Sequence, residues 1–142
     1  MATVKTTATF DATPDKVWAV VSDLPRWGEW LVIHRSWQGD VPASVSAGAV
    51  ATANANVMNM PIAIEWTVDN LSPLHRLAMS GKTRAGILLS LRLDLVPVDD
   101  RTRLDIEIVI NGGMIDSPMG GIFRKTLTGA LDKSSRRLGA LL

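Results

Sequence analysis

The chain has 142 residues and an almost balanced charge, with 15 Lys and Arg, 14 Asp and Glu, and a formal net charge of +1. A net charge this small gives no overall field that would attract nucleic acid or an anionic membrane surface. The sequence has no cysteine, which excludes disulfide bonds, thiol catalysis and thiolate metal sites. Nothing in its composition divides the chain, so we expect one domain over residues 1–142.

The N-terminal residues lack the apolar stretch of a secretion signal. The sequence also has no run of roughly 20 apolar residues, which is the length that a membrane-spanning helix needs. These two features predict a cytoplasmic protein without an integral membrane segment.

The first elements expected along the chain are a strand and two short helices. Residues 3–10 are rich in Thr and Val, a composition typical of a strand. Thr13 then stands at a helix N-cap position, followed by Pro14 at the first helical position and Asp15 near the positive end of the helix. A second short helical segment is expected over residues 26–31.

Beyond residue 34 the hydrophobic pattern changes to the period of two that marks β-strands. Ile62, Ile64 and Trp66 occupy alternate positions, with Glu65 and Thr67 on the opposite face, and leucines and isoleucines repeat this pattern further along the chain. One apolar and one polar face predict antiparallel strands that are wet on one side and covered on the other. The strands are expected at residues 34–39, 48–57, 62–70, 75–83, 87–97 and 102–110.

A long amphipathic helix is expected to cover the apolar face of the sheet. Ser117 and Pro118 form a helix-start signal, from which the helix can run to Leu142. Its basic residues lie mostly opposite the apolar stripe and are expected to form a solvated face, not a nucleic-acid site. The fold class is therefore α+β: a curved antiparallel sheet of about seven strands around a long C-terminal helix, with two short helices after the first strand.

The order of elements and two stretches of sequence resemble the START/Bet v 1-like (SRPBCC) superfamily, which includes polyketide cyclase/dehydrase and lipid transport proteins. The stretches are FDATPDKVW (residues 10–18) and DLPRWGEWL (residues 23–31), and the resemblance runs from residue 3 to the C-terminus. It implies a helix-grip fold whose cavity lies between the sheet and the long helix, with a hydrophobic small molecule as the ligand.

Scattered residues are also similar to an actinobacterial branch of that superfamily, whose members include toxin components of toxin–antitoxin pairs. This narrower resemblance implies an antitoxin as a partner protein. The residues that carry it are Trp30, Leu31, His34, Trp37, Gly48, Met60, Pro61, Trp66 and Thr67.

Few groups in the sequence are suited to catalysis. His34 and His75 belong to no metal-binding or catalytic motif, and each is either a general base or an ordinary edge or surface histidine. The strand carboxylates fall on the polar face, which argues against an acid/base pair inside the fold. We expect no catalytic residue, no cofactor and no metal site, with a polyketide cyclase or dehydrase as the alternative function. These carboxylates are Glu65, Asp94, Asp105 and Glu107.

Two features decide whether the interior is hollow. Alanines occupy alternate positions from Ala49 to Ala55, and facing inward they would leave a shallow apolar wall. The opposite phase would bury Asn54 and Asn56 without partners, at a cost of about 1–3 kcal/mol each, so we expect the alanines inside. The five tryptophans are the opposing feature, because they can either line a cavity or fill it.

Two glycine pairs, at 112–113 and 120–121, bracket a segment that contains Met114 and Met119. Glycine costs a helix about 1 kcal/mol per residue relative to alanine, so this segment can be loose and can gate a cavity mouth. The alternative is a closely packed loop whose glycines adopt a positive φ.

The leading hypothesis is a non-enzymatic protein that binds a hydrophobic small molecule, such as a lipid or a polyketide-like compound, in an internal cavity. Apolar walls with few polar groups are the usual form of such sites. The expected ligand-binding residues are Trp66, Met79, Leu89, Leu91, Ile106, Ile108, Phe123 and Leu127.

Overall fold

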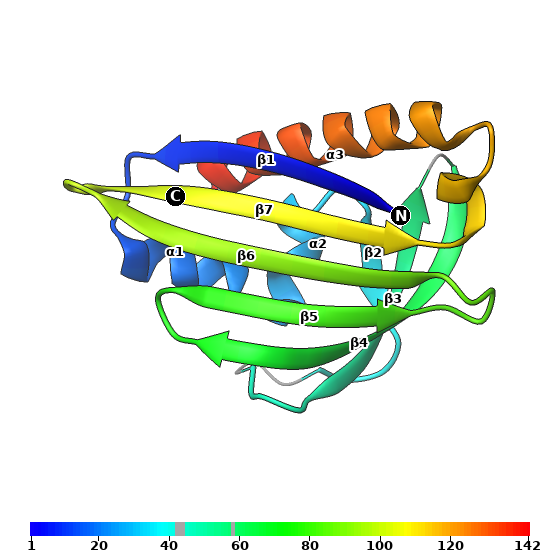
Figure 1. Cartoon of the computed structure of the whole chain (residues 1–142). Helices are drawn as coiled ribbons and strands as arrows, with labels where there is room; N and C mark the ends of the chain where they lie inside the picture. Colours follow the sequence, from blue (N-terminus) through cyan, green and yellow to red (C-terminus); the bar gives the residue numbers. More distant parts are fainter. Residues whose placement is uncertain (42–44, 58) are drawn as a thin grey trace.

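The computed structural model describes residues 1–41, 45–57 and 59–142 and confirms the predicted α+β helix-grip fold. The described strands form one curved antiparallel sheet in the order β1-β7-β6-β5-β4-β3-β2, so the first strand pairs with the last (Figure 1). The strands are β1 (Ala2–Phe10), β2 (His34–Trp37), β3 (Val50–Val57), β4 (Met60–Ser72), β5 (Arg76–Lys82), β6 (Leu88–Val98) and β7 (Arg101–Asn111).

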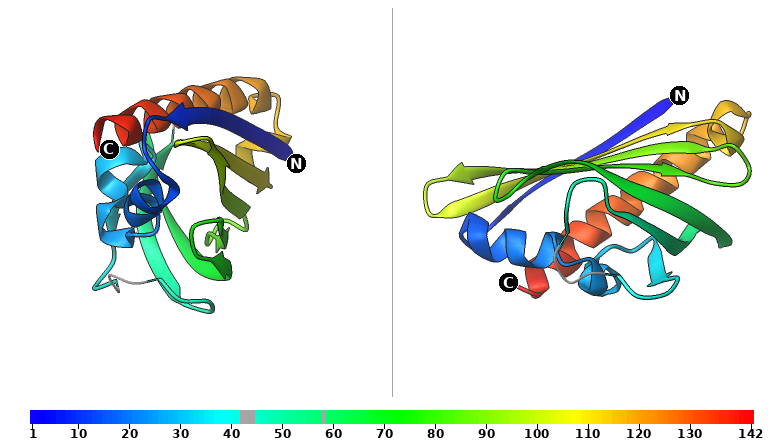
Figure 2. Two further views of the ribbon diagram at one scale, coloured as in Figure 1. Left: turned by 90° about the vertical axis from the view of Figure 1, so that its left-hand side faces the viewer. Right: turned by 90° about the horizontal axis from the view of Figure 1, so that it is seen from below.

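The helices lie on the concave side of this sheet, where α3 packs against β1 and α2 (Figure 2). No helix of the described residues is long and apolar enough to cross a membrane. The helices and 3-10 turns are α1 (Pro14–Val21), η1 (Leu24–Arg26), α2 (Trp27–Trp30), η2 (Gly113–Asp116) and α3 (Gly120–Ala140).

The inward face of the sheet is the one that the alternation predicts. On β3, Ala53 and Ala55 are buried, so the alanines face inward as expected. Asn54 points to the other face, where it accepts a hydrogen bond from Gln38 at 2.9 Å and donates one to Ser36 at 2.9 Å. The wall that β3 contributes to the interior is therefore apolar and shallow.

The outer face of the sheet carries the strand carboxylates in ion pairs, as predicted. Asp94 pairs with Arg76 at 2.5 Å and with Arg92 at 3.0 Å, and Glu107 pairs with Lys5 at 3.3 Å. Exposed pairs of this kind each contribute at most about 1 kcal/mol, so their main consequence is that charge is kept out of the interior. Glu65 and Asp105 pair with Lys82 and Arg103.

The last helix begins later than its start signal predicts. Ser117 and Pro118 lie in a turn between η2 and α3, where the carbonyl oxygen of Ser117 accepts a hydrogen bond from the N–H of Gly120 at 2.9 Å. Thr13 does occupy the N-cap position of α1, but its hydroxyl bonds to Asp15 and not to a helix N–H. Both sequence signals therefore lie close to a helix start, as expected. The cap itself differs, because α3 begins only at Gly120 and the Thr13 hydroxyl bonds to Asp15.

A buried serine connects α3 to the chain after α2. The hydroxyl of Ser134 accepts a hydrogen bond from the N–H of Val32 at 2.9 Å and donates one to the carbonyl oxygen of Ala130 at 2.7 Å. The side chain is fully buried, so the N–H of Val32 depends on this hydroxyl. The adjacent Ser135 is also buried, but its hydroxyl has no hydrogen-bond partner among the described residues.

Replacing Ser134 by alanine is expected to lower the free energy of unfolding by about 0.5–1.5 kcal/mol, because a part-buried N–H then loses its acceptor. The measurement is urea unfolding followed by circular dichroism. Ser135→Ala is the matched control and is expected to change stability by less than about 0.5 kcal/mol, since it removes an unpaired hydroxyl. Equal losses in the two variants would contradict this assignment.

Candidate functional site

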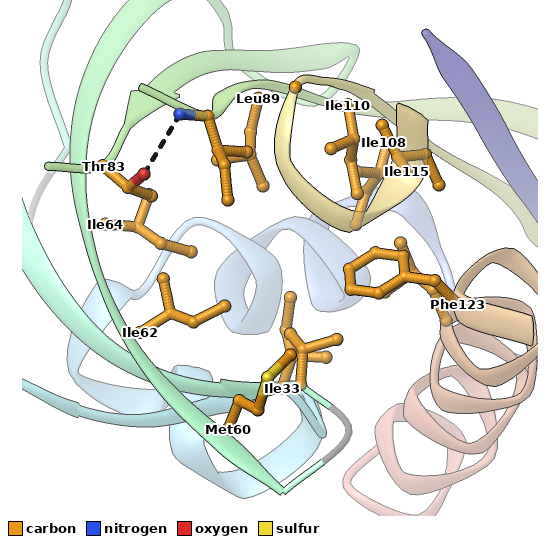
Figure 3. A pocket seen from close by; sticks show the side chains of 14 residues that line it. Ile33, Met60, Ile62, Ile64, Thr83, Leu89, Ile108, Ile110, Ile115 and Phe123 are labelled. Carbon is orange, nitrogen blue, oxygen red and sulfur yellow. Dashed lines mark hydrogen bonds between the residues drawn. The ribbon is translucent and has the colours of Figure 1, made fainter. Parts of the chain in front are cut away.

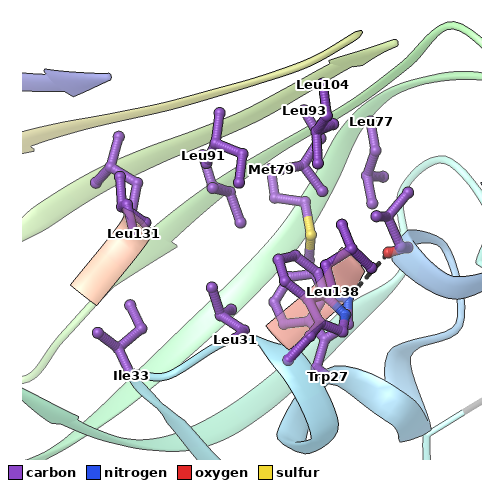
Figure 4. Packing of buried hydrophobic residues seen from close by; sticks show 14 of the residues in the cluster. Trp27, Leu31, Ile33, Leu77, Met79, Leu91, Leu93, Leu104, Leu131 and Leu138 are labelled. Atoms are coloured by element: carbon purple, nitrogen blue, oxygen red, sulfur yellow. Dashed lines mark hydrogen bonds between the residues drawn. The ribbon is translucent and has the colours of Figure 1, made fainter. Parts of the chain in front are cut away.

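Aromatic rings fill the middle of the concave side. Trp27 of α2 is fully buried, and its indole N–H donates a hydrogen bond to the carbonyl oxygen of Val21 at 3.1 Å. Its ring centroid lies 6.4 Å from that of Trp66 on β4 and 5.4 Å from that of Trp37 on β2. Figure 4 shows Trp27 in the packed part of the core together with Met79. The tryptophans therefore fill a part of the interior, which is one of the two predicted alternatives.

The opposite end of the concave side bears on the other predicted alternative, a hollow interior. A cavity of about 60 Å³ lies between the sheet, η2 and the first turns of α3 (Figure 3). Leu89 and Ile108 line it from the sheet, and Phe123 and Leu127 line it from α3. These four residues belong to the predicted ligand-binding set.

The other four predicted residues, Trp66, Met79, Leu91 and Ile106, lie in the packed core and do not line this cavity. Alternation identifies the face of a strand that points inward, but it does not say where along the strand the space lies. The remaining lining residues are not in the predicted ligand-binding set, and they lie near the hairpin ends of the strands and in the adjoining loops. They are Ile33, Val57, Met60, Ile62, Ile64, Thr83, Ile87, Ile110, Gly112 and Ile115.

The cavity wall presents apolar atoms only, as far as the described residues form it. Thr83 is in the lining, but its hydroxyl accepts a hydrogen bond from the N–H of Ile87 at 3.2 Å and so serves the β5–β6 loop (Figure 3). No titratable side chain lines the cavity within the described part of the chain. A polar guest atom would lose its water here without gaining a partner, so the wall suits an uncharged, apolar group.

One side of the cavity is closed by η2. Gly112 and Gly113 precede and start this turn with φ of 90° and 62°, and a Cβ on Gly113 would lie 2.8 Å from the side chain of Ile87. Asp116 accepts a hydrogen bond from the N–H of Gly112 at 3.0 Å, and Ile115 faces the cavity. Gly112 and Gly113 thus serve a closely packed loop with positive φ, as the second interpretation predicts, whereas Gly120 and Gly121 lie in the first turn of α3.

The η2 segment also has features that are expected of a gate at the cavity mouth. Met119 is exposed beside it, whereas the side chain of Met114 lies outside what the structure describes. The η2 turn is short and half-exposed, and among its described side chains Ile115 lines the cavity. Asp116 on this turn pairs with the N-terminal amine of Met1 at 2.9 Å, but both groups are exposed, so this contact holds the turn only weakly.

Neither histidine faces the cavity. His34 is buried, with its ring centroid 4.7 Å from that of Trp37 and 6.0 Å from that of Trp27, and burial lowers the pKa of His34 to about 4. His75 is exposed in the turn before β5. Within the described residues, no three His, Asp or Glu side chains form a group that could hold a metal ion.

Comparisons with known proteins agree with this architecture. The family described as polyketide cyclase / dehydrase and lipid transport matches residues 1–142. A protein of Mycobacterium tuberculosis, Uncharacterized protein Rv1546, is 28% identical over 141 residues, covering 99% of each chain. Another from the same organism, named Toxin Rv0910, is 26% identical over 121 residues, covering 85% of this chain and 84% of the other.

The fold is also similar to that of solved structures. A START superfamily protein from Mycobacterium smegmatis superposes with a TM-score of 0.77 at 13% sequence identity, covering 97% of this chain and 94% of the other. An identity this low supports the fold alone.

Acid is expected to destabilise the protein through His34. In the unfolded chain its pKa returns to about 6.5, so between pH 6.5 and 4 the unfolded state takes up a proton that the folded state does not. The free energy of unfolding should then be about 2 kcal/mol lower at pH 5 than at pH 7.5. Urea unfolding across this range measures the slope, and His34→Phe, which keeps a ring beside the tryptophans, should flatten it. A slope equal in both proteins would contradict this role.

Proposed function

Because the chain belongs to the polyketide cyclase/dehydrase and lipid transport family, we propose that it binds an uncharged hydrophobic small molecule in the cavity between the sheet and α3. The observation that carries this proposal is the wall itself, whose described residues offer apolar atoms only. Burial of each methylene group of a guest contributes about 0.8 kcal/mol. An unpaired polar atom costs about 1–3 kcal/mol, so the same wall selects against polar guests.

The size of the cavity supports binding that is coupled to movement of the wall. An apolar cavity of about 150 Å³ holds one benzene molecule, and the cavity here measures about 60 Å³. A guest larger than a few carbon atoms must therefore displace part of the wall. The η2 turn is the part best suited to move, since it is short, half-exposed and flanked by Gly112 and Gly113.

Binding is favoured over catalysis because acid/base chemistry needs a titratable group within reach of the guest. His34 packs against tryptophans in the filled part of the core, and the strand carboxylates are paired on the outer face. A cyclase or dehydrase would find no titratable side chain among the described residues of the cavity wall to serve as its acid or base. Transport or sequestration of the guest needs no such group.

Binding of an uncharged fluorescent probe, N-phenyl-1-naphthylamine, tests the proposal. The wild-type protein is expected to bind it saturably, and native mass spectrometry of protein purified from cells should show co-purified apolar molecules. Leu89→Gln places an amide in the cavity wall and is expected to weaken binding about tenfold or more, because the amide has no partner there. Ser90→Gln adds the same group on the exposed outer face of the same strand and should leave binding unchanged. An absence of binding, or equal effects of both variants, would count against the proposal.

A second candidate function is that of a toxin, favoured by the 26% identity to the protein named Toxin Rv0910. On this reading the partner would be an antitoxin protein. Induced expression in a bacterial host is expected to arrest growth, and co-expression of the protein encoded by the adjacent gene should relieve the arrest. If growth is arrested, expression of the Leu89→Gln variant shows whether the arrest depends on the cavity. Normal growth at a verified level of folded protein would remove this candidate.

A further inference from the structure

Behind the inner end of the cavity lies an unusual pair of neighbouring positions on the sheet. Trp66 on β4 pairs with Gly81 on β5, and Gly81 pairs in turn with Leu89, which lines the cavity. A Cβ on Gly81 would lie 2.7 Å from a methyl group of Ile64 and 3.0 Å from two ring atoms of Trp66. The space that a side chain at position 81 would take is therefore filled by the Trp66 indole and by Ile64, which is itself a wall residue.

The indole of Trp66 is held firmly from behind. Trp66 is 3% exposed, and its ring meets that of the fully buried Trp27 edge to face. The next inward-facing row of the sheet contains Met79 and Leu91, which are buried in the packed core. Movement of the indole away from the cavity would displace several close-packed side chains at once, which is costly in an interior of normal density.

The opposite end of the cavity is built differently. Ile115 on η2 is half-buried, and Met60 at the start of β4 is 37% exposed. The cavity therefore has one rigid end at Ile64, which the Trp66 indole backs, and one end that yields at η2. A guest that needs more room gains it at the η2 end.

On the basis of the proposed function, we propose that Ile64, backed by the Trp66 indole that is seated over Gly81, is the length stop of the cavity. The guest places a compact apolar end against Ile64 and directs its polar end toward η2. The site then takes molecules whose uncharged hydrocarbon end fits between Ile64 and η2, and the extra methylene groups of longer straight chains gain no further apolar contact. This assigns to Trp66 a role in specificity in addition to its place in the core.

A length stop and a purely structural tryptophan differ in what their replacement changes. Loss of a structural residue lowers stability and weakens all guests alike. Loss of a length stop changes how affinity depends on chain length. Leucine is smaller than tryptophan by roughly the volume of two methylene groups, so Trp66→Leu should admit a chain about two carbon atoms longer.

The experiment is calorimetric titration of primary n-alkanols from butanol to decanol into the wild-type protein, Trp66→Leu and Trp37→Leu. In the wild type, affinity is expected to rise about fourfold per methylene group and then to stop rising at a definite chain length. In Trp66→Leu this limit should move to longer chains by about two carbon atoms. Trp37→Leu is the matched control, because Trp37 also packs against Trp27 but is not among the side chains nearest to the space over Gly81 that Ile64 and Trp66 fill, and its limit should equal that of the wild type.

An unchanged limit in folded Trp66→Leu overturns the length stop, and so does an equal shift in Trp37→Leu. If Trp66→Leu does not fold, Trp66→Phe is the milder variant, and in its folded form it must still move the limit by at least one carbon atom. Failure of the wild-type protein to bind any alkanol would overturn the proposed function itself, whereas binding with an unshifted limit overturns the length stop alone.

Discussion

The burial of Trp27 is the interaction on which the rest of the interior depends. Helix α2 has four residues, and a helix of that length has no stability of its own in water. Trp27 fixes it by packing against Trp37 on β2 and Trp66 on β4, while its N–H bonds to the carbonyl oxygen of Val21 at the end of α1. One indole thus connects both N-terminal helices to the far edge of the sheet, and the packed half of the core forms around it.

This packing divides the interior into two parts with different properties. Around Trp27 the rings of three tryptophans and His34 pack against one another. Toward η2 the inward residues are mostly aliphatic, the wall is shallow and a cavity remains. The rigid part and the yielding part share one boundary, at Trp66 and Ile64, so the geometry of the aromatic cluster also sets the shape of the site. The ion pairs of the strand carboxylates lie on the convex face, away from the cavity.

Much of the fold can be predicted from the sequence because it depends on local periodicity. The alternation at Ile62, Ile64 and Trp66 indicates the inward face of β4, and the cost of burying Asn54 selects the phase of β3. All eight predicted wall residues lie on inward faces, and four of them line the cavity.

The division between filled and hollow parts could not be predicted in this way. Leu89 and Leu91 have the same alternation and the same chemistry, yet only Leu89 lines the cavity. The difference comes from what stands opposite them, which depends on the register of β5 and on the absence of a side chain at Gly81. What lies opposite each leucine is a property of the tertiary structure, and the alternation along one strand does not contain it. A glycine within a strand next to a large aromatic residue is the sequence feature that points toward it, because such a glycine often marks a close approach.

The folding stability of the protein limits the size of an empty cavity. An unfilled apolar cavity costs about 24 cal/mol for each Å³, so about 60 Å³ costs about 1.4 kcal/mol. A standing cavity ten times larger would cost about 14 kcal/mol, which equals the whole stability of a typical domain. A protein that must remain folded without its guest is therefore better served by a small cavity with one yielding wall than by a permanent tunnel. The guest then provides the apolar contacts that the displaced wall gives up, and the firm packing of Trp66 behind Ile64 directs the displacement to η2 and away from the core.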